Sequence, residues 1–512
     1  MLSTIHSAAN EGVEAYLVDV EIALYWGLPG VHMVGLPGTA VQEAKERVRS
    51  AIKHSGYDFP RQRITINLAP AHTRKAAPVF DLAIAIGLLM GSEQIQAQDW
   101  EQGVMVGELS LDGSVRGVHG VLPFCLAARA QGKREIIVPQ TNVPEASLVK
   151  GLNIYGVSHL KEAVQLLSQT PTERQSVKHH WKPTTTSHYS HDFSEVVGQA
   201  FAKRALEIAA AGRHNIMLIG PPGTGKTMLA ERTVGIFPPL NLEETLAATK
   251  IYSIAGQLND KHYWVKTRPF RHPHHSISTR GLIGGSVPPR PGELSLAHQG
   301  ILFLDEFLEF SKKNLEMLRQ PIENGCITLV REGRAVQFPS EVMLIAALNP
   351  CPCGYYGDTE KPCRCTEYDL LRYWRKLSAP LLDRFDLFVE LPRVAIKQLQ
   401  HALPAETTAT IRDRVIQATN FQQQRWEASQ PSTPLSSNAR LSKKMLAKYC
   451  QLDTKNQDFL ARATETLELS PRSYYRLLKV SRTIADLEQS ERVQRHHLSE
   501  ALQFRHAFDK YF

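Results

Sequence analysis

The pattern of apolar and polar positions divides this chain of 512 residues into three structured parts. In residues 1–168, short strand-like apolar runs alternate with helical ones, and the same alternation resumes in residues 193–392. Residues 393–512 show mainly helical periodicity with polar breaks. Residues 169–192 are rich in Thr, Ser, His and Lys and poor in large aliphatic side chains, which is typical of a linker. We therefore expect two α/β domains joined by a linker, followed by a helical domain.

The composition is ordinary for a globular protein, with a modest excess of positive charge. Hydrophobic residues make up 43% and charged residues 21%, and the net charge is +8. This charge permits contact with nucleic acid, but a solvated basic surface explains it equally well. The apolar stretch from Phe80 to Met90 is too short to span a bilayer and contains Asp81, and the first residues lack the layout of a secretory signal. We expect a cytoplasmic protein with no membrane partner.

A glycine-rich loop between a predicted strand and a predicted helix is the most informative motif. In this setting glycines let backbone N–H groups turn toward a polyphosphate, and the helix N-terminus adds partial positive charge. Lys226 would reach the β and γ phosphates, and Thr227 would bind Mg²⁺. The loop predicts a nucleoside triphosphate site made of Gly220, Pro221, Pro222, Gly223, Thr224, Gly225, Lys226 and Thr227.

Two further predicted strands end in polar residues that suit the same site. Residues 300–304 are apolar apart from their glycine and precede Asp305 and Glu306, and residues 342–348 precede Asn349. The carboxyl ends of buried parallel strands open on the ligand crevice. Asp305 would hold Mg²⁺, Glu306 would polarise the attacking water, and Asn349 would orient it. For Asn349 the alternative is an asparagine that only forms a turn before the following proline.

Two arginines far from the loop in sequence are candidates for contacting phosphate. Arg384 follows the segment Pro380-Leu-Leu-Asp383, and Arg472 lies at the start of a predicted helix. An arginine supplied by a neighbouring subunit raises the rate of characterised nucleotidases by about 10³–10⁵. On the residues alone, either arginine is equally explained as part of an ordinary surface.

A predicted β-hairpin lies between the strand that ends at Asp305 and the strand that ends at Asn349. Residues 326–338 form two short strand-like runs about a Glu-Gly turn. Arg331 and Arg334 flank that turn and would pair with DNA phosphates. A solvent-exposed tip, where basic residues are common, is the alternative.

Four of the seven cysteines lie within fifteen positions. They form two Cys-x-Cys pairs separated by nine residues, and four thiolates suit tetrahedral Zn²⁺. The alternative is a turn with four reduced thiols. The predicted zinc ligands are Cys351, Cys353, Cys363 and Cys365.

These motifs together resemble the AAA+ ATPases of the magnesium-chelatase-like family, over nearly the full length of the chain. The segments that carry the resemblance are residues 268–275, 284–293, 304–306, 347–354, 382–384 and 480–487. The resemblance implies ATP and Mg²⁺ as cofactors, Lys226 and Thr227 as the Walker A pair, and Asp305 and Glu306 as Walker B. It also implies Asn349 as sensor 1, Arg384 as an arginine finger acting on a neighbouring subunit, and Arg472 as the sensor 2 arginine of a helical lid.

The resemblance extends to assembly and partners. It implies a homohexameric ring with ATP between subunits, and it is greatest to the competence-associated DNA helicases of the family. Residues 250–295 resemble the insert that lines the central channel, which makes Arg271 a further candidate DNA contact. A metal site formed by His272, His274 and His275 is the alternative for this segment.

The N-terminal part resembles the α/β domain of Lon proteases, a ribosomal S5-like fold. Alignment on the serine and lysine motifs of that family places Val79 at the nucleophile and Leu122 at the base. Neither side chain can attack a carbonyl or accept a proton, so we expect no peptidase activity from this pair.

The sequence therefore predicts a Lon-protease-like domain (1–168), a linker (169–192), an AAA+ P-loop core with a parallel sheet (193–392) and a helical lid (393–512). The expected function is ATP hydrolysis that drives branch migration of recombination intermediates during natural transformation. Single-stranded and branched DNA, further copies of the chain and recombination proteins are the expected partners. The alternative is a chelatase-like or chaperone-like ATPase that remodels a protein.

Overall fold

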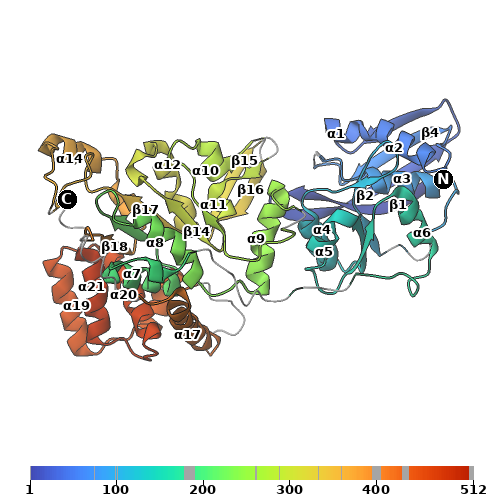
Figure 1. Cartoon of the computed structure of the whole chain (residues 1–512). Helices are drawn as coiled ribbons and strands as arrows, with labels where there is room; N and C mark the ends of the chain where they lie inside the picture. Colours follow the sequence, from blue (N-terminus) through green and yellow to red (C-terminus); the bar gives the residue numbers. More distant parts are fainter. Residues whose placement is uncertain are drawn as a thin grey trace.

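The structure is a computed structural model that shows two units joined end to end (Figure 1). It describes residues 2–73, 75, 77–97, 100, 102–177, 181, 191–259, 262–286, 289–331, 334–358, 360–394, 405–428 and 437–506.

The N-terminal unit is built on a seven-stranded mixed sheet with the order β3-β4-β2-β1-β5-β8-β9. β2 pairs antiparallel with β1 and β4, and the other neighbouring strands pair in parallel. The strands are β1 (Leu2–Glu11), β2 (Glu14–Tyr25), β3 (Gly30–Val34), β4 (Arg63–Ala69), β5 (Gly103–Met105), β8 (Glu135–Pro139) and β9 (Asn153–Val157), with a small hairpin of β6 (Glu108–Leu109) and β7 (Val115–Arg116). The helices are α1 (Thr39–Gln42), α2 (Ala44–His54), α3 (Asp81–Gly91), α4 (Val121–Ala130), α5 (Val143–Ala146) and α6 (Leu160–Ser168).

Helix α3 forms the centre of the N-terminal core, because it is buried at every position except Met90. It packs against β1 and β2, and its single charged residue, Asp81, is bound by Arg47 at 2.7 Å. Burial raises the pKa of Asp81 to about 6, although Arg47 acts in the opposite direction. Val79 and Leu122 lie in the same core with 2% and 0% of their surfaces exposed. Both positions therefore serve packing in this unit.

The second unit contains a five-stranded parallel sheet with the order β11-β14-β17-β10-β18. The strands β10, β14 and β17 are buried at every position, as expected for a parallel sheet covered on both faces. The sheet strands are β10 (Ile216–Ile219), β11 (Phe270–Arg271), β14 (Ile301–Leu304), β17 (Met343–Leu348) and β18 (Leu387–Glu390). Two hairpins lie outside the sheet, β12 (Gly284–Gly285) with β13 (Arg290–Pro291), and β15 (Cys326–Arg331) with β16 (Arg334–Pro339). The helices are α7 (Ala200–Gly212), α8 (Lys226–Thr233), α9 (Leu242–Ala255), α10 (Thr279–Ile283), α11 (Glu293–Leu296), α12 (Lys312–Met317), α13 (Arg319–Asn324), α14 (Glu367–Trp374) and α15 (Ala379–Leu382).

The C-terminal helices form a bundle against one side of this sheet (Figure 1). They are α17 (Thr408–Glu427), α18 (Lys443–Tyr449), α19 (Thr454–Thr466), α20 (Pro471–Leu487) and α21 (Arg495–His506). Helices α17 and α20 pack on α7, and α21 packs on β18. Bundle and sheet share one hydrophobic cluster that includes Ile208, Leu387, Val415 and Ile484. The bundle is therefore continuous with the core of the second unit.

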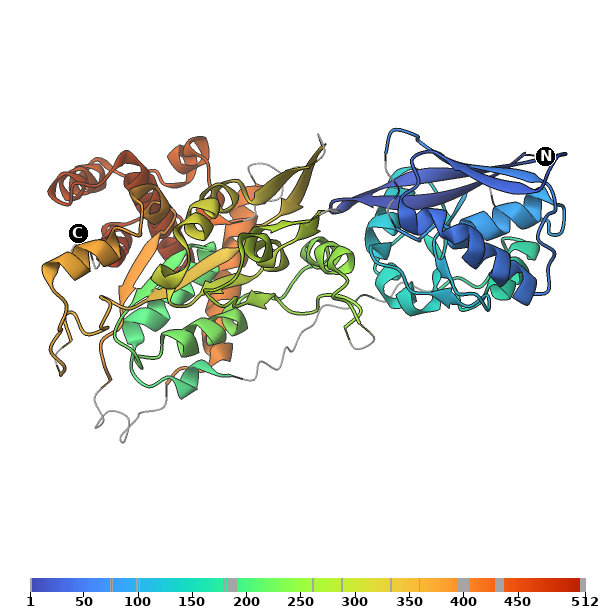
Figure 2. The same ribbon diagram turned by 90° about the horizontal axis from the view of Figure 1, so that it is seen from above.

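The two units touch through the β1–β2 hairpin and α4 on one side, and through the β15–β16 hairpin and α9 on the other (Figure 2). Val13, in the β1–β2 turn, is buried in the hydrophobic cluster of the second unit. Gly12 beside it has φ +64°, and a Cβ at this position would lie 2.3 Å from Cγ1 of Val336. Only glycine therefore allows the turn to approach β16 this closely.

A buried carboxyl group forms the polar part of the same contact. Glu145 at the end of α5 is 5% exposed and accepts hydrogen bonds from the Ser253 hydroxyl on α9 and from the Leu122 backbone N–H, the latter at 2.8 Å. Burial raises the pKa of Glu145 to about 7, while these hydrogen bonds act in the opposite direction. An ion pair between Lys250 and Glu14 at 2.7 Å also joins the two units.

The structure confirms the predicted fold class, a mixed α/β chain with a parallel-sheet core and helices at its C-terminal end. The exact limits of the four predicted segments stay a prediction, and residues 178–180 and 182–190 of the predicted linker lie outside the described residues. Within the described part of the chain, no helix combines the length and apolar character needed to cross a bilayer.

Candidate nucleotide-binding site

The glycine-rich loop lies at the carboxyl edge of the parallel sheet, between β10 and α8. β10 runs between β17 and β18, so the loop follows an inner strand of the sheet. Gly223 and Gly225 have φ values of +80° and +89°, and a Cβ on either would meet no atom within 4 Å. The backbone conformation, rather than crowding, therefore requires glycine at both positions. The loop keeps open space on its outer side, as a phosphate-binding loop needs.

Lys226 is folded back on the loop. Its ammonium group donates to the carbonyl oxygens of Gly220 at 2.6 Å and Pro221 at 2.9 Å, and to Oδ1 of Asn349 at 3.2 Å. Burial lowers the pKa of Lys226 to about 8, although Asp305 and Glu306 act in the opposite direction. A bound polyphosphate would replace these neutral acceptors with charged ones.

The lowered pKa predicts that nucleotide binding takes up a proton at alkaline pH. A polyphosphate raises the pKa of Lys226, so the lysine is already charged below pH 8 but must be protonated on binding above it. We expect ATP affinity to fall by up to about tenfold per pH unit above about pH 8. Titration calorimetry at about pH 9, in two buffers of different ionisation enthalpy, measures the uptake directly. Lys226→Arg is the control, because its guanidinium stays charged, and equal uptake by this variant would contradict the assignment.

The Walker B residues lie directly beside the loop. The hydroxyl of Thr227 donates to Oδ2 of Asp305 at 2.7 Å, so the two predicted Mg²⁺ ligands are already together. Oxygen ligands of this kind suit Mg²⁺. Glu306 follows β14 in a left-handed conformation with φ +49°, which is uncommon for a residue with a side chain. Its side chain is 56% exposed, and Oε2 lies 3.2 Å from Nδ1 of His275.

Asn349 completes this edge at the end of β17. Its side-chain oxygen accepts from Lys226, and its backbone oxygen accepts from the hydroxyl of Tyr373 on α14 at 3.1 Å. The structure thus brings the loop, Asp305 and Asn349 together, as expected from the ends of three parallel strands. The roles assigned to these side chains stay predictions.

Arg384 and Arg472 lie together at the opposite, amino edge of the sheet. The backbone oxygen of Arg384 accepts from the Asn215 side chain at 2.8 Å, and Asn215 immediately precedes β10. The strand that separates Asn215 from Gly220 places the two edges on the order of 15 Å apart. Both guanidinium groups bind Glu323, that of Arg472 at 2.9 Å. Neither arginine therefore faces the loop of its own chain.

The predicted hairpin is present, and its register places both arginines beside the turn. β15 and β16 pair antiparallel, with Arg331 opposite Arg334. Arg271, the third predicted DNA contact, lies instead in strand β11, where Glu293 binds its guanidinium through two hydrogen bonds of 2.6 Å. Its role in DNA contact stays a prediction, and the hairpin is the stronger candidate because its two strands project from the sheet (Figure 2).

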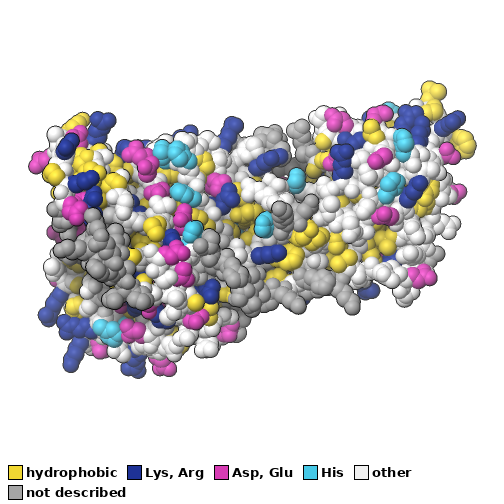
Figure 3. All heavy atoms as spheres, in the orientation of Figure 1, with side chains coloured by type: hydrophobic (Ala, Val, Ile, Leu, Met, Phe, Trp, Pro, Cys, Tyr) yellow, Lys and Arg dark blue, Asp and Glu magenta, His cyan; other side chains and the backbone are white. Residues whose placement is uncertain are grey.

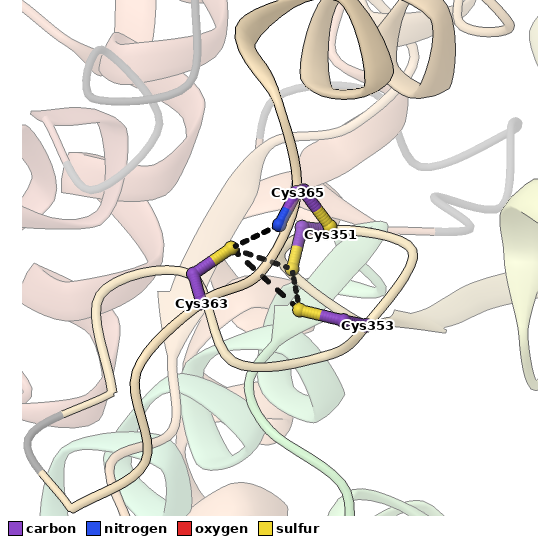
Figure 4. Close-up of side chains that lie close together, drawn as sticks. All are labelled: Cys351, Cys353, Cys363 and Cys365. Atoms are coloured by element: carbon purple, nitrogen blue, oxygen red, sulfur yellow. Dashed lines mark hydrogen bonds between the residues drawn. The ribbon is translucent and has the colours of Figure 1, made fainter.

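The four predicted zinc ligands gather in one place. The sulfur atoms of Cys351, Cys353, Cys363 and Cys365 all lie within 4.8 Å of one another, on the loop between β17 and α14 (Figure 4). Among the described residues, His272, His274 and His275 do not form a group of this kind. His275 contacts Glu306 instead.

Comparison with protein families agrees with this geometry. Residues 192–399 match the family "Magnesium chelatase, subunit ChlI", residues 20–142 match "Subunit ChlI of Mg-chelatase", and residues 405–505 match its C-terminal domain. The chain is also 43% identical over 508 residues to Competence protein ComM of Haemophilus influenzae, covering 98% of this chain and 97% of the relative. The chain belongs to the magnesium-chelatase-like AAA+ family. This family assignment indicates an ATPase that uses ATP and Mg²⁺.

Other members of this AAA+ family are similar over the same length. The protein YifB of Escherichia coli is 43% identical over 507 residues, covering 98% of this chain and 97% of YifB. An archaeal Lon protease of Thermoplasma volcanium is 44% identical over 54 residues, which cover 10% of this chain and 8% of the protease. The family therefore extends over the whole chain, whereas the similarity to Lon is local.

Three residues that contact the predicted site residues are not apparent from the sequence. They are His275 against Glu306, Tyr373 against Asn349, and Glu323 between the two arginines. The histidine-rich run of residues 272–275 is a visible signal, but its resemblance to a channel insert points away from the ATP site. Glu323 and Tyr373 stand in no motif, so no pattern along the chain could reveal them.

Proposed function

We propose that this protein is an ATP-driven DNA motor that assembles as a homohexameric ring and promotes branch migration of recombination intermediates. One relative that is similar over its full length is named Competence protein ComM, and this favours a role in natural transformation. ATP hydrolysis at the nucleotide site described above would supply the energy. Two further features support the assembly and the substrate.

The first feature is the position of the arginines, which supports a site shared between subunits. Arg384 and Arg472 lie at the edge opposite the loop, in a pocket between the sheet and the helical bundle. Other basic residues line the same pocket: Arg213, Arg440, Lys443, Arg476 and Lys479. Such a concentration of positive charge suits an anionic ligand held by a neighbouring copy. In a ring, Arg384 and Arg472 would face the ATP of the next subunit. Their ion pairs with Glu323 would then be exchanged for contacts with the phosphates of that ATP.

The second feature is the β15–β16 hairpin, and this observation carries the proposed DNA substrate. The hairpin is inserted between the strand that ends at Asp305 and the strand that ends at Asn349. Along the chain, the hairpin is therefore flanked on both sides by strands that end in residues proposed to sense the γ-phosphate. Arg331 and Arg334 are paired in register next to the turn, where two cations would bind backbone phosphates without reading sequence. Val13 and Gly12 of the N-terminal unit pack against Val336 at the side of the hairpin.

DNA-stimulated ATP hydrolysis tests this proposal. We expect single-stranded and forked DNA to increase the ATPase rate several-fold, and ATP to drive movement of a four-way junction. Arg331→Glu/Arg334→Glu should weaken DNA binding at least about tenfold at about 0.1 M salt and remove the stimulation, because four units of charge change beside the phosphates. Binding is measured by fluorescence anisotropy, and hydrolysis by phosphate release.

The matched control reverses the same charge elsewhere. Lys455→Glu/Arg462→Glu changes two exposed residues of α19 and should keep the stimulation. No stimulation of the wild-type protein by any DNA, together with no movement of the junction, would contradict the motor. Equal loss in both double variants would contradict the hairpin as the contact.

One observation favours the alternative, an ATPase that remodels a protein partner. Hydrophobic side chains are exposed at the end of the N-terminal unit that points away from the second unit (Figure 3). The loop after β2 contributes Trp26 and Leu28, which are 94% and 90% exposed, and Leu2 is 73% exposed. Exposed apolar groups of this kind are typical of protein contacts. Substitution of both loop residues by Ser should leave DNA stimulation intact if DNA is the substrate.

A further inference from the structure

The four-cysteine loop (residues 351–365) has the geometry of a metal site. The Sγ atom of Cys351 lies 3.3 Å from that of Cys353 and 3.7 Å from that of Cys363, and the last two are 3.6 Å apart. None of the four is in a disulfide, whose sulfurs would be only about 2.05 Å apart. Tetrahedral zinc, with bonds of about 2.3 Å, holds its sulfur ligands about 3.8 Å from one another. The spacing therefore fits one ion at the centre of the group.

The surrounding backbone also suits thiolates. The N–H of Tyr356 donates to the sulfur of Cys351 at 3.3 Å, and the N–H of Cys365 donates to the sulfur of Cys363 at 3.4 Å. Donors aimed at ligating atoms stabilise their negative charge and orient them. Cys351 is fully buried, so its sulfur faces the protein interior and the other three sulfurs. These contacts show a loop shaped around its sulfur atoms.

This four-cysteine loop is in direct contact with the nucleotide site. Gly354 has φ +85°, and a Cβ at this position would lie 2.8 Å from Cδ of Pro222 in the phosphate-binding loop. The four-cysteine loop starts two residues after Asn349, and it leads into α14, whose Tyr373 hydroxyl binds the Asn349 carbonyl oxygen. Gly354 and the two elements that flank the loop are therefore all next to the ATP site.

We propose that Cys351, Cys353, Cys363 and Cys365 bind a structural zinc ion, and that the zinc-bound loop holds Pro222 and Asn349 in position for ATP. The ion replaces a hydrophobic core in this segment, since the loop carries few apolar side chains and its described residues form no helix or strand. The second half of the proposal rests on the glycine-rich loop being the ATP site. It does not depend on DNA as the substrate.

Elemental analysis of the full-length protein tests the metal. Protein purified without chelators should contain about one zinc per chain, and Cys353→Ser/Cys363→Ser should contain less than about 0.1, because two of four ligands are lost. Cys326→Ser, at a cysteine in β15 outside the group, should keep the full amount. Wild-type protein with well below one zinc per chain, or with iron in its place, overturns the metal site.

Two alanine substitutions test the connection to ATP without touching a ligand. Gly354 and Gly357 lie in the same loop and both have positive φ, but a Cβ on Gly357 would meet no atom within 4 Å. Both variants should keep zinc, and Gly354→Ala alone should weaken binding of a fluorescent ATP analogue by about tenfold, measured by equilibrium titration. Equal affinity in the two variants overturns the positioning role. Neither measurement uses DNA, so failure here and failure of the motor proposal remain distinguishable.

Discussion

Glu306→Gln is expected to bind ATP with near wild-type affinity but to hydrolyse it about 10²–10⁴ times more slowly. The substitution keeps the shape of the side chain and removes the carboxylate that would accept a proton from the attacking water. Binding should survive because Lys226, Thr227 and Asp305 form their contacts without the Glu306 carboxylate. The unusual backbone at φ +49° and the contact with His275 also remain available to glutamine.

The nearby Glu309→Gln is the matched control for this experiment. Glu309 is 51% exposed on its side chain, and its nearest partner is Lys376 at 3.8 Å, a weak surface contact. Its ATPase rate should stay within about twofold of wild type. The assignment of Glu306 is lost if its glutamine variant turns over ATP at the wild-type rate, and weakened if both variants lose activity together.

The part of the site that is predictable from the sequence depends on local patterns. Glycine spacing, buried strands and a polar residue at each strand end are properties of short segments, and parallel strands necessarily bring their carboxyl ends to one edge. The sequence alone therefore predicts that the glycine-rich loop, Asp305 and Asn349 lie close together, as they do through Lys226 and Thr227. The cysteine group is equally local, since all four cysteines lie on one short loop.

The rest depends on how distant segments pack, which no local pattern records. No motif indicates on which side of the sheet Arg472 lies: α20 packs on α7 and places this residue beside Arg384 at the amino edge, away from the loop of its own chain. Contact between the two units was also invisible, because it joins Glu145 to Ser253 and Gly12 to Val336, pairs that are far apart along the chain. Along the sequence, an arginine such as Arg472 has the same pattern of neighbours whether its helix places it at the carboxyl edge or at the amino edge of the sheet.

Mixing two inactive variants should restore ATP hydrolysis, because each site is proposed to combine two subunits. Arg384→Ala should reduce the rate by about 10³ or more while keeping ATP binding, and Lys226→Ala should abolish binding. In rings that contain both, the intact loop of one subunit meets the intact arginine of the other. With random mixing and independent sites, roughly a quarter of the wild-type rate should return. Co-expression with two different tags and purification on both selects the mixed assemblies.

The control for this mixing experiment combines defects on the same side of the interface. Rings of Lys226→Ala with Glu306→Gln contain no complete site, so they should stay inactive. Arg384 is buried and bound to Glu323, so the melting temperature and the ATP affinity of its variant are measured first to show that the variant is folded. Recovery in the first mixture and not in the second would place Arg384 on the neighbour's ATP. Absence of recovery in both would contradict the shared site, and the two arginines at the amino edge would then need another anionic partner.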